Sequence, residues 1–196
     1  MDKKNEILEV TFELFTEKGY QASMSDIAKK VKLKTPSLYS HFENKEEIMD
    51  IVIRREIYSF FTELENKLIS LLDVEVEKAL REAYFFILDY YSDKGRIRFW
   101  RNISLINNLE LREKSREYIQ KRELVIAKLT KQIFEKGTRE KIIREECSEG
   151  CFFLYLAMIQ GVLDGMLLYD DNSGIDMEVF INGVWNSYWQ GISSGR

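Results

Sequence analysis

The sequence predicts an all-α protein of about nine helices, and three observations carry this prediction. The 196 residues include one proline and ten glycines, whereas Leu, Ile, Glu and Lys are plentiful. Helix interiors exclude proline, and sheet-rich chains need more turn residues. Apolar residues also recur at helical spacing, often behind residues that cap helices. We therefore expect an N-terminal three-helix head over residues 1–46 and a C-terminal helical bundle over residues 47–196.

The head opens with the signals of two helices. Apolar residues recur at helical spacing over residues 7–15 behind Asp2, and Gly19 stands where a helix would end. Ser23 and Asp26 then match the capping-box pattern, in which each side chain satisfies an amide at a helix start. The apolar run that follows is brief, so the second helix is predicted to be short.

A third short helix is predicted over residues 37–42. Thr35 is a good N-cap, and Pro36 follows at a position where the first helical turn tolerates proline. Asn44 caps a fourth helix, which is expected to run long through apolar positions up to Leu68. Two short helices about three residues apart form a helix-turn-helix unit.

Turn signals divide the remainder of the chain into further helices. These are predicted over residues 75–91 and 96–106, in a charged helix that follows Asn107-Asn108 and reaches Lys136, and over residues 147–169 and 177–192. Gly137 is expected to end the charged helix.

Charge is unevenly distributed. The chain has a net charge of -4, which does not suggest a nucleic-acid ligand. Between Met24 and Lys45, however, five lysines stand against two acidic residues, a local net charge of +3. A local basic patch of this kind is what contact with phosphate needs.

Residues 38–48, Leu-Tyr-Ser-His-Phe-Glu-Asn-Lys-Glu-Glu-Ile, resemble the signature of the TetR family of transcription regulators. Asp26-Ile27-Ala28 and the Phe15…Gly19-Tyr20 helix end fit the same pattern, and the resemblance covers roughly the first fifty residues. Beyond them, only the chain length, the spacing of the helices and a Gly137…Ile142-Ile143-Arg144 connection agree with the family. Lys32 departs from the family, which usually has glycine in this turn. Since lysine tolerates a left-handed backbone poorly, the turn is expected to be strained or differently shaped.

The resemblance implies a regulator, expected to be a repressor, that binds double-stranded operator DNA. The first turn of a helix in the major groove meets base edges, and the small side chains there offer few bidentate contacts. Bases are therefore expected to meet Ser25, Lys34, Thr35, Pro36 and Ser37, and phosphates to meet Tyr39, Ser40, His41 and Lys45. Tyr39 and His41 could instead pack inside the head, and Lys29 and Lys30 could be ordinary solvated lysines, whereas Leu38 and Phe42 are expected in the core.

The family also implies a C-terminal domain that senses a small effector and forms a homodimer. The proposed effector is hydrophobic or aromatic, and cationic if Asp89 or Asp164 is buried; its binding would release a palindromic operator. Candidate lining residues are Tyr84, Tyr91, Trp100, Asn107, Tyr155 and Met158, although a residue of this kind taken singly is more often plain core than a ligand contact. Control by a protein partner, or dimerisation alone, is the alternative.

The resemblance to the TetR family also implies that the last two helices form the dimer interface. Gly161 and Gly165 share a face that would let another helix approach closely, and Phe180, Val184, Trp185, Tyr188 and Trp189 are candidates for burial. Residues 151–169 could instead span a membrane, but Gln160 and Asp164 oppose this, because a central aspartate costs about 2.5–3.5 kcal/mol on insertion scales. With no signal peptide, a cytoplasmic, nucleoid-associated protein is expected.

No enzymatic activity, cofactor or metal site is predicted. His41 is the only histidine and lies in the head, so no Ser-His or Cys-His pair is available to the C-terminal domain. Asp170-x-Asn172-x-Gly174 only faintly resembles a calcium loop and is interpreted as a turn. Cys147 and Cys151 are expected as reduced, partly buried thiols, with a metal half-site or a redox switch as the alternative.

Overall fold

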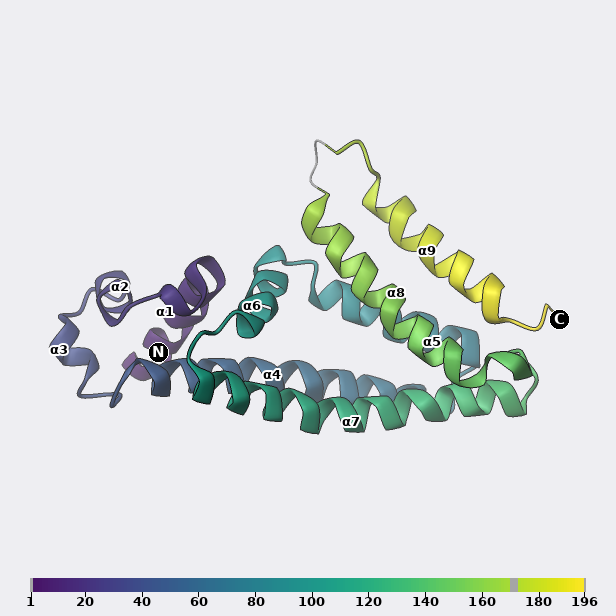
Figure 1. Ribbon diagram of the computed structural model, residues 1–196, viewed down its shortest axis with the longest axis horizontal. Helices are drawn as coiled ribbons and strands as arrows, with labels where there is room; N and C mark the ends of the chain where they lie inside the picture. The colour runs from purple at the N-terminus through teal and green to yellow at the C-terminus, as the bar shows by residue number, and fades with distance from the viewer. Residues whose placement is uncertain (1, 170–172, 196) are drawn as a thin grey trace. The chain divides into compact units, whose positions relative to one another are not determined.

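The computed structural model describes residues 2–169 and 173–195, apart from the side chains of residues 147 and 148. The described residues form nine α-helices and two 3-10 turns, which confirms the predicted all-α fold (Figure 1). In chain order the elements are α1 (Lys3–Lys18), η1 (Gly19–Gln21), α2 (Met24–Lys30), α3 (Thr35–Leu38), α4 (Lys45–Leu71), α5 (Val76–Tyr90), α6 (Lys94–Ser104), α7 (Leu109–Arg139), η2 (Glu145–Cys147), α8 (Ser148–Leu168) and α9 (Met177–Ile192).

The chain forms two compact units, and each is built from two separate stretches of sequence. The first unit comprises Met1–Phe61 and Gly95–Glu123, and the second comprises Thr62–Lys94 and Leu124–Arg196. The long helices α4 and α7 therefore contribute residues to both units. The predicted domain boundary after residue 46 separates a head and a bundle by their expected functions, whereas these two units are defined by their compactness. The boundary therefore stays a prediction.

In the first unit, α4 and α7 are joined by both a polar and an aromatic contact. The hydroxyl of Tyr118 donates to Oδ1 of Asp50 over 3.2 Å. The ring of Tyr118 also lies edge-on to Tyr58, with centroids 6.2 Å apart. Burial and the neighbouring carboxylate raise the pKa of Tyr118, so it remains a hydrogen-bond donor at neutral pH.

The second unit is built around an aromatic core between α5, α8 and α9. Trp185 is 1% exposed, and its ring centre lies 5.5 Å from that of Tyr84 and 6.1 Å from that of Tyr188. The ring centre of Tyr188 lies 5.7 Å from that of Tyr155. Trp185 and Tyr188 are thus buried as predicted, whereas Phe180, Val184 and Trp189 are only half-buried.

Each buried tyrosine of this core has a partner for its hydroxyl group. Tyr84 donates to the carbonyl of residue 181 over 3.0 Å, Tyr155 to that of residue 80 over 2.8 Å, and Tyr188 to that of residue 151 over 2.8 Å. Burial raises the pKa of Tyr84 to about 12 and raises the other two pKa values as well. These bonds avoid the cost of a buried hydroxyl without a partner and tie α5 to α8 and α9.

Within α8, Glu149–Leu168 is the one segment of the described residues that is long and apolar enough to cross a membrane by length and composition. A core helix of a soluble protein passes the same test, and one face of this helix does pack inward, through Phe152, Tyr155 and Val162. The predicted membrane-opposing residues Gln160 and Asp164 lie on its exposed face.

The structure corrects the prediction for Cys151. This residue is buried and disulfide-bonded rather than a reduced thiol. The side chain of Cys147 lies outside the described residues, as do Asp170 and Asn172 of the loop that faintly resembled a calcium site. Among the described residues, no three His, Cys, Asp or Glu side chains gather where they could hold a metal ion.

The end of α7 was predicted wrongly. Gly137 lies inside the helix, which continues to Arg139, and the chain then turns at Lys141 with a φ of 58°. A Cβ at position 137 would lie 2.6 Å from Cδ1 of Ile143 and 2.9 Å from Cγ1 of Val76. Gly137 therefore serves close packing against these two side chains rather than a helix stop.

We expect Gly137→Ala to destabilise the protein by about 1–3 kcal/mol, because the added methyl group overpacks this contact. Gly150→Ala is the matched control: it is also a helical glycine, but no atom lies within 4 Å of its Cβ position. The control should be neutral or stabilising by up to about 1 kcal/mol. Urea unfolding at matched protein concentration measures both; equal effects of the two substitutions would contradict this explanation of Gly137.

Candidate DNA-binding site

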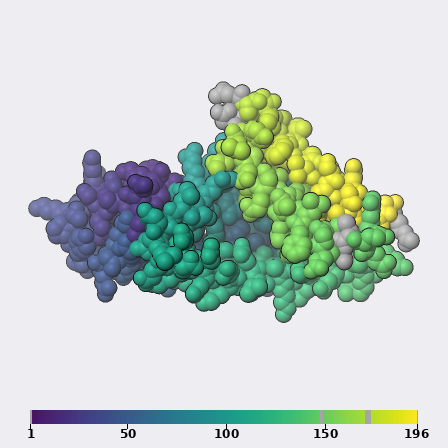
Figure 2. Space-filling model, viewed as in Figure 1, coloured from purple at the N-terminus to yellow at the C-terminus, as the bar shows by residue number. Residues whose placement is uncertain are grey.

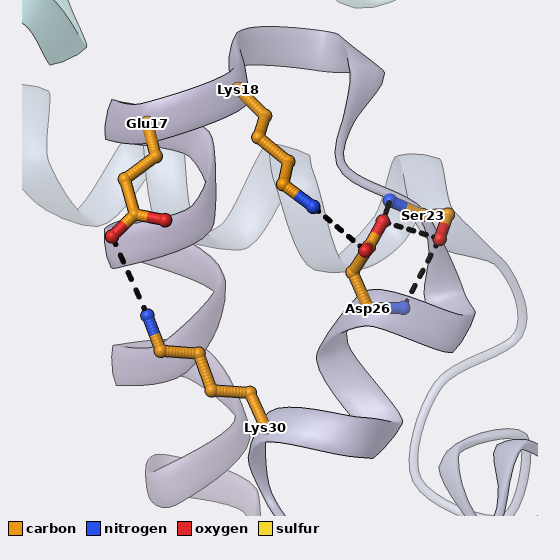
Figure 3. A network of polar contacts seen from close by, with 5 residues as sticks. All are labelled: Glu17, Lys18, Ser23, Asp26 and Lys30. Atoms are coloured by element: carbon orange, nitrogen blue, oxygen red, sulfur yellow. Dashed lines mark hydrogen bonds and ion pairs between the residues drawn. The ribbon is translucent and has the colours of Figure 1, made fainter.

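The first helix of the helix-turn-helix begins at the predicted capping box. Oγ of Ser23 accepts from the amide of Asp26 over 3.1 Å, and the Asp26 carboxylate accepts from the amide of Ser23 over 2.9 Å (Figure 3). Nζ of Lys18 lies 2.8 Å from the same carboxylate. The bonds from Lys18 and Ser23 hold the pKa of Asp26 well below its usual range. The start of α2 is thereby fixed to the end of α1.

The end of α2 is tied to α1 through Lys30. Its ammonium lies 3.0 Å from Glu13 and 3.7 Å from Glu17, and the hydrogen bond to Glu13 raises its pKa. Figure 3 shows the side chain crossing from α2 to Glu17. Lys30 is thus paired within the head, although it is exposed like Lys29.

The turn between the two short helices is a Schellman motif with lysine where glycine is usual. Lys32 has a φ of 56°. Its amide donates to the carbonyl of Lys29, and the amide of Leu33 donates to the carbonyl of Ala28. These are the two bonds that define the motif. The strained turn predicted at Lys32 is therefore present.

The second short helix, α3, differs from the prediction at both ends. Its N-cap is Lys34 rather than Thr35, so Pro36 stands second in the helix. It ends at Leu38 rather than at residue 42, because the amides of His41 and Phe42 both turn back to the carbonyl of Leu38. Leu38 and Phe42 are buried, as predicted.

The predicted DNA-contacting residues lie at the surface of the head. Tyr39 is 54% exposed and His41 is also exposed, so the alternative that these two pack inside the head is wrong. The full set consists of Ser25, Lys34, Pro36, Tyr39, Ser40 and His41, which are exposed, and Thr35, Ser37 and Lys45, which are half-buried. A ligand can therefore reach hydroxyl, imidazole and ammonium groups that lie close together in the sequence.

Lys45 has a structural role that the sequence did not suggest. Its Nζ donates to the carbonyl of Tyr20 over 2.8 Å and lies 3.8 Å from the centre of the Tyr20 ring. The hydroxyl of Tyr20 in turn donates to Glu46, and this bond lowers the pKa of that carboxyl group. The beginning of α4 is therefore held against the end of α1, and two hydrogens of the ammonium remain for a phosphate.

Two residues of α6 complete the support of the head. Phe99 is fully buried, and its ring centre lies 4.9 Å from that of Phe12 and 5.1 Å from that of Phe15. Nδ2 of Asn102 donates to the carbonyls of Phe15 over 2.8 Å and Thr16 over 3.2 Å. Sequence reasoning missed both residues, because no local pattern indicates which distant helix meets the end of α1.

The six predicted effector-binding residues lie in different surroundings, and their role in binding an effector stays a prediction. Tyr84 and Tyr155 lie in the packed aromatic core, where both hydroxyl groups have partners. Tyr91 is buried, Met158 is half-buried, Trp100 contacts Phe60 and Phe61, and Asn107 is exposed. None of the six lines the pocket between α5, α8 and α9 that is described below.

Comparison with known proteins agrees with this geometry. Residues 7–51 match the profile "Bacterial regulatory proteins, tetR family". The biofilm operon icaADBC HTH-type negative transcriptional regulator IcaR of Staphylococcus epidermidis is 48% identical over 46 residues, which cover 23% of this chain and 25% of that protein. The chain thus matches about a quarter of the length of this relative.

Among solved structures, the chain resembles two transcriptional regulators along nearly its whole length. The ketosteroid transcriptional regulator KstR2 of Mycobacterium tuberculosis has a TM-score of 0.73 and 16% identity, with 98% of this chain and 96% of that one covered. FadR of Bacillus subtilis, solved in complex with stearoyl-CoA, has a TM-score of 0.70 and 19% identity, with 96% and 98% covered. At these identities the likeness shows the fold.

The helix-turn-helix segment of this chain matches the model of the tetR family of bacterial regulatory proteins, which confirms the resemblance predicted from residues 38–48. Along nearly its whole length the chain has the fold of two solved structures that are described as TetR-family regulators.

Replacing Lys32 by glycine tests the strain in the turn. A left-handed backbone costs an L-residue about 1–2 kcal/mol, and glycine would remove this cost. Part of that stabilisation is lost, because glycine has more conformational freedom in the unfolded chain. We expect Lys32→Gly to stabilise the protein by about 0.5–1 kcal/mol in thermal or urea unfolding. Lys29→Gly removes the same charge from the regular helix α2 and should destabilise by about 1 kcal/mol. Loss of stability in both variants would contradict the strain.

Proposed function

We propose that this protein is a DNA-binding transcriptional repressor that recognises its operator with the first turn of α3. The observation that carries the proposal is the capped helix-turn-helix of the tetR family, with its short second helix at the surface. That IcaR is a negative transcriptional regulator supports repression rather than activation. The protein would act on DNA in the cytoplasm.

The proposed contacts divide into two kinds. Lys34, Thr35, Pro36 and Ser37, with Ser25 of α2, would meet base edges in the major groove. Tyr39, Ser40, His41 and Lys45 would meet phosphates and fix the register. The small side chains of the first group favour recognition of thymine methyl groups and of DNA shape over bidentate hydrogen bonds.

A homodimer is proposed to form through the outer faces of α8 and α9. Large apolar side chains are exposed there: Phe153 is 58% exposed, Leu154 54% and Val179 68%. No atom lies within 4 Å of a Cβ placed at Gly161 or Gly183, so another helix has room to approach. Figure 2 shows atoms of α8 and α9 at the surface. Two heads related by a two-fold axis would match a palindromic operator.

One part of the predicted interface is occupied within the chain. A Cβ at Gly165 would lie 2.9 Å from Cε1 of Phe180, so this glycine admits α9 of its own chain rather than a second copy. The proposed interface therefore rests on Gly161 and Gly183 and on the exposed apolar residues of α8 and α9.

A small effector is proposed to control operator binding, with control by a protein partner as the alternative. FadR of Bacillus subtilis binds stearoyl-CoA in its solved complex, which supports ligand sensing by this fold. To release an operator almost completely, an effector must prefer the DNA-free state about 10⁴-fold, or by ~5.5 kcal/mol. Affinity alone is therefore not sufficient for induction.

The proposed operator contacts are tested by Lys34→Ala and Tyr39→Phe. Lys34 caps α3 through its backbone only, so Lys34→Ala leaves the helix start intact. We expect each variant to weaken operator binding about three- to tenfold, the equivalent of one lost hydrogen bond. Fluorescence anisotropy against genomic fragments that flank the gene of this protein, over a salt series, provides the measurement.

Lys128→Ala is the control, because it removes one exposed positive charge from α7, outside the proposed interface with DNA. Its affinity should equal that of the wild type. If Lys34→Ala and Tyr39→Phe also bind like the wild type on a fragment bound tightly in a sequence-dependent way, the assignment of these contacts is wrong. If the wild type prefers no fragment of the whole genome, the proposed function is wrong.

The proposed dimer is tested by Leu154→Glu, which places a charge on the exposed face of α8. We expect a dimeric wild type and a largely monomeric variant at micromolar concentration in analytical ultracentrifugation, because an unpaired charge is costly to bury. Leu124→Glu is the matched control, since Leu124 is 72% exposed but lies on α7. A Leu154→Glu protein that remains as dimeric as the control would refute this interface.

A further inference from the structure

A pocket of about 570 Å³ lies between α5, α8 and α9 in the second unit. This volume is within the range of pockets that bind small molecules. Its walls are mainly apolar and include Phe85 and Leu88 of α5, Met166 of α8 and Ile181 of α9. Methionine adapts to ligands of different outline, so part of the wall can adjust. The shape and lining are those of a site for an apolar molecule.

The pocket lies away from the proposed dimer face. Ile181 lines it, whereas Val179, two positions earlier on α9, is 68% exposed on the outer side. The main chain at Ile181 is also held toward α5 by the hydroxyl of Tyr84. Formation of the homodimer would therefore leave the pocket open.

The charged groups around the pocket are unbalanced. The carboxylates of Asp89 and Glu178 border it together with one ammonium group, that of Lys94. Among the described residues neither carboxylate forms an ion pair, and Nζ of Lys94 lies 3.5 Å from the carbonyl of Tyr169. The lining residues therefore carry one net negative charge, while the guanidinium of Arg81 lies just outside the lining and donates to Oδ1 of Asn182 over 3.4 Å.

Aromatic walls add to this preference for a positive charge. Phe85 and Tyr169 both line the pocket. The guanidinium of Arg81, which is not among the lining residues, already lies 4.7 Å from the centre of the Phe85 ring. An aromatic ring attracts a cation through its quadrupole, and the attraction increases when the cation is desolvated.

We propose that this pocket binds an apolar organic cation, with its apolar body between Phe85, Met166 and Ile181 and its positive charge toward Asp89 and Glu178. An apolar anion of the same size would meet one ammonium and two carboxylates. The sequence suggested a cationic effector only if Asp89 or Asp164 were buried; in the structure both are exposed, and Asp89 lies at the rim of the pocket. The inference rests on the proposed function only for the consequence of binding, the release of DNA.

The test compares two ions of nearly the same shape and opposite charge, tetraphenylphosphonium and tetraphenylborate. Isothermal titration calorimetry of the full-length protein without DNA should show saturable binding of the cation, with the anion at least about tenfold weaker. Asp89→Asn and Glu178→Gln should each weaken the cation about two- to fivefold, the effect of one exposed ion pair. Lys94→Gln should strengthen it.

Two further variants separate the pocket from the general surface. Ser92→Trp introduces a large side chain from an exposed lining position and should abolish binding. Glu140→Gln removes an exposed carboxylate elsewhere in the same unit and should leave the affinity unchanged. Circular dichroism and thermal unfolding verify that each variant is folded.

Equal affinity for the two ions, no binding of the cation, or cation binding that Ser92→Trp and the two rim substitutions leave unchanged would overturn the proposal. Its failure is distinct from failure of the proposed function, because operator binding is measured separately in the anisotropy experiment. Cation binding that depends on these residues would establish the site even in a protein that prefers no DNA fragment.

Discussion

The packing of α6 against the end of α1 is the contact on which the helix-turn-helix unit depends. Helices α2 and α3 have seven and four residues, and helices this short are not stable alone. Phe99 supplies the head with a fully buried ring from outside the first sixty residues, and Asn102 satisfies carbonyls at the end of α1. The compact unit that contains the helix-turn-helix therefore includes Gly95–Glu123 as well.

Around this contact, caps and ion pairs rather than helix propensity set the geometry of the head. Ser23 and Asp26 fix where α2 begins, Lys30 holds its end to α1, and Lys45 joins Tyr20 to α4. These groups lie at the surface, where each contributes modestly and salt weakens it. Together these contacts set the positions of the short helices rather than add much stability, and they leave the first turn of α3 at the surface.

In the second unit, the inner and outer sides of α8 and α9 differ in what they contact. The inner side forms the aromatic core, in which the hydroxyl groups of Tyr84, Tyr155 and Tyr188 each donate to a backbone carbonyl. The outer side keeps large apolar residues exposed, as an interface between copies requires. Between α5 and the two helices lies the pocket, so the proposed sites for a second copy and for a ligand can be occupied together.

The sequence by itself determined what depends on neighbours a few residues apart. The capping box at Ser23 and Asp26, the helix end at Gly19 and the helix over residues 177–192 were all predicted, because caps and apolar periodicity are local signals. Only the tertiary structure decided that Gly137 of α7 packs against Val76 and Ile143 and that Asn102 contacts α1. It also decided which side chains line a pocket. Those features depend on contacts between residues far apart in the chain, and a single sequence carries no record of which helix faces which.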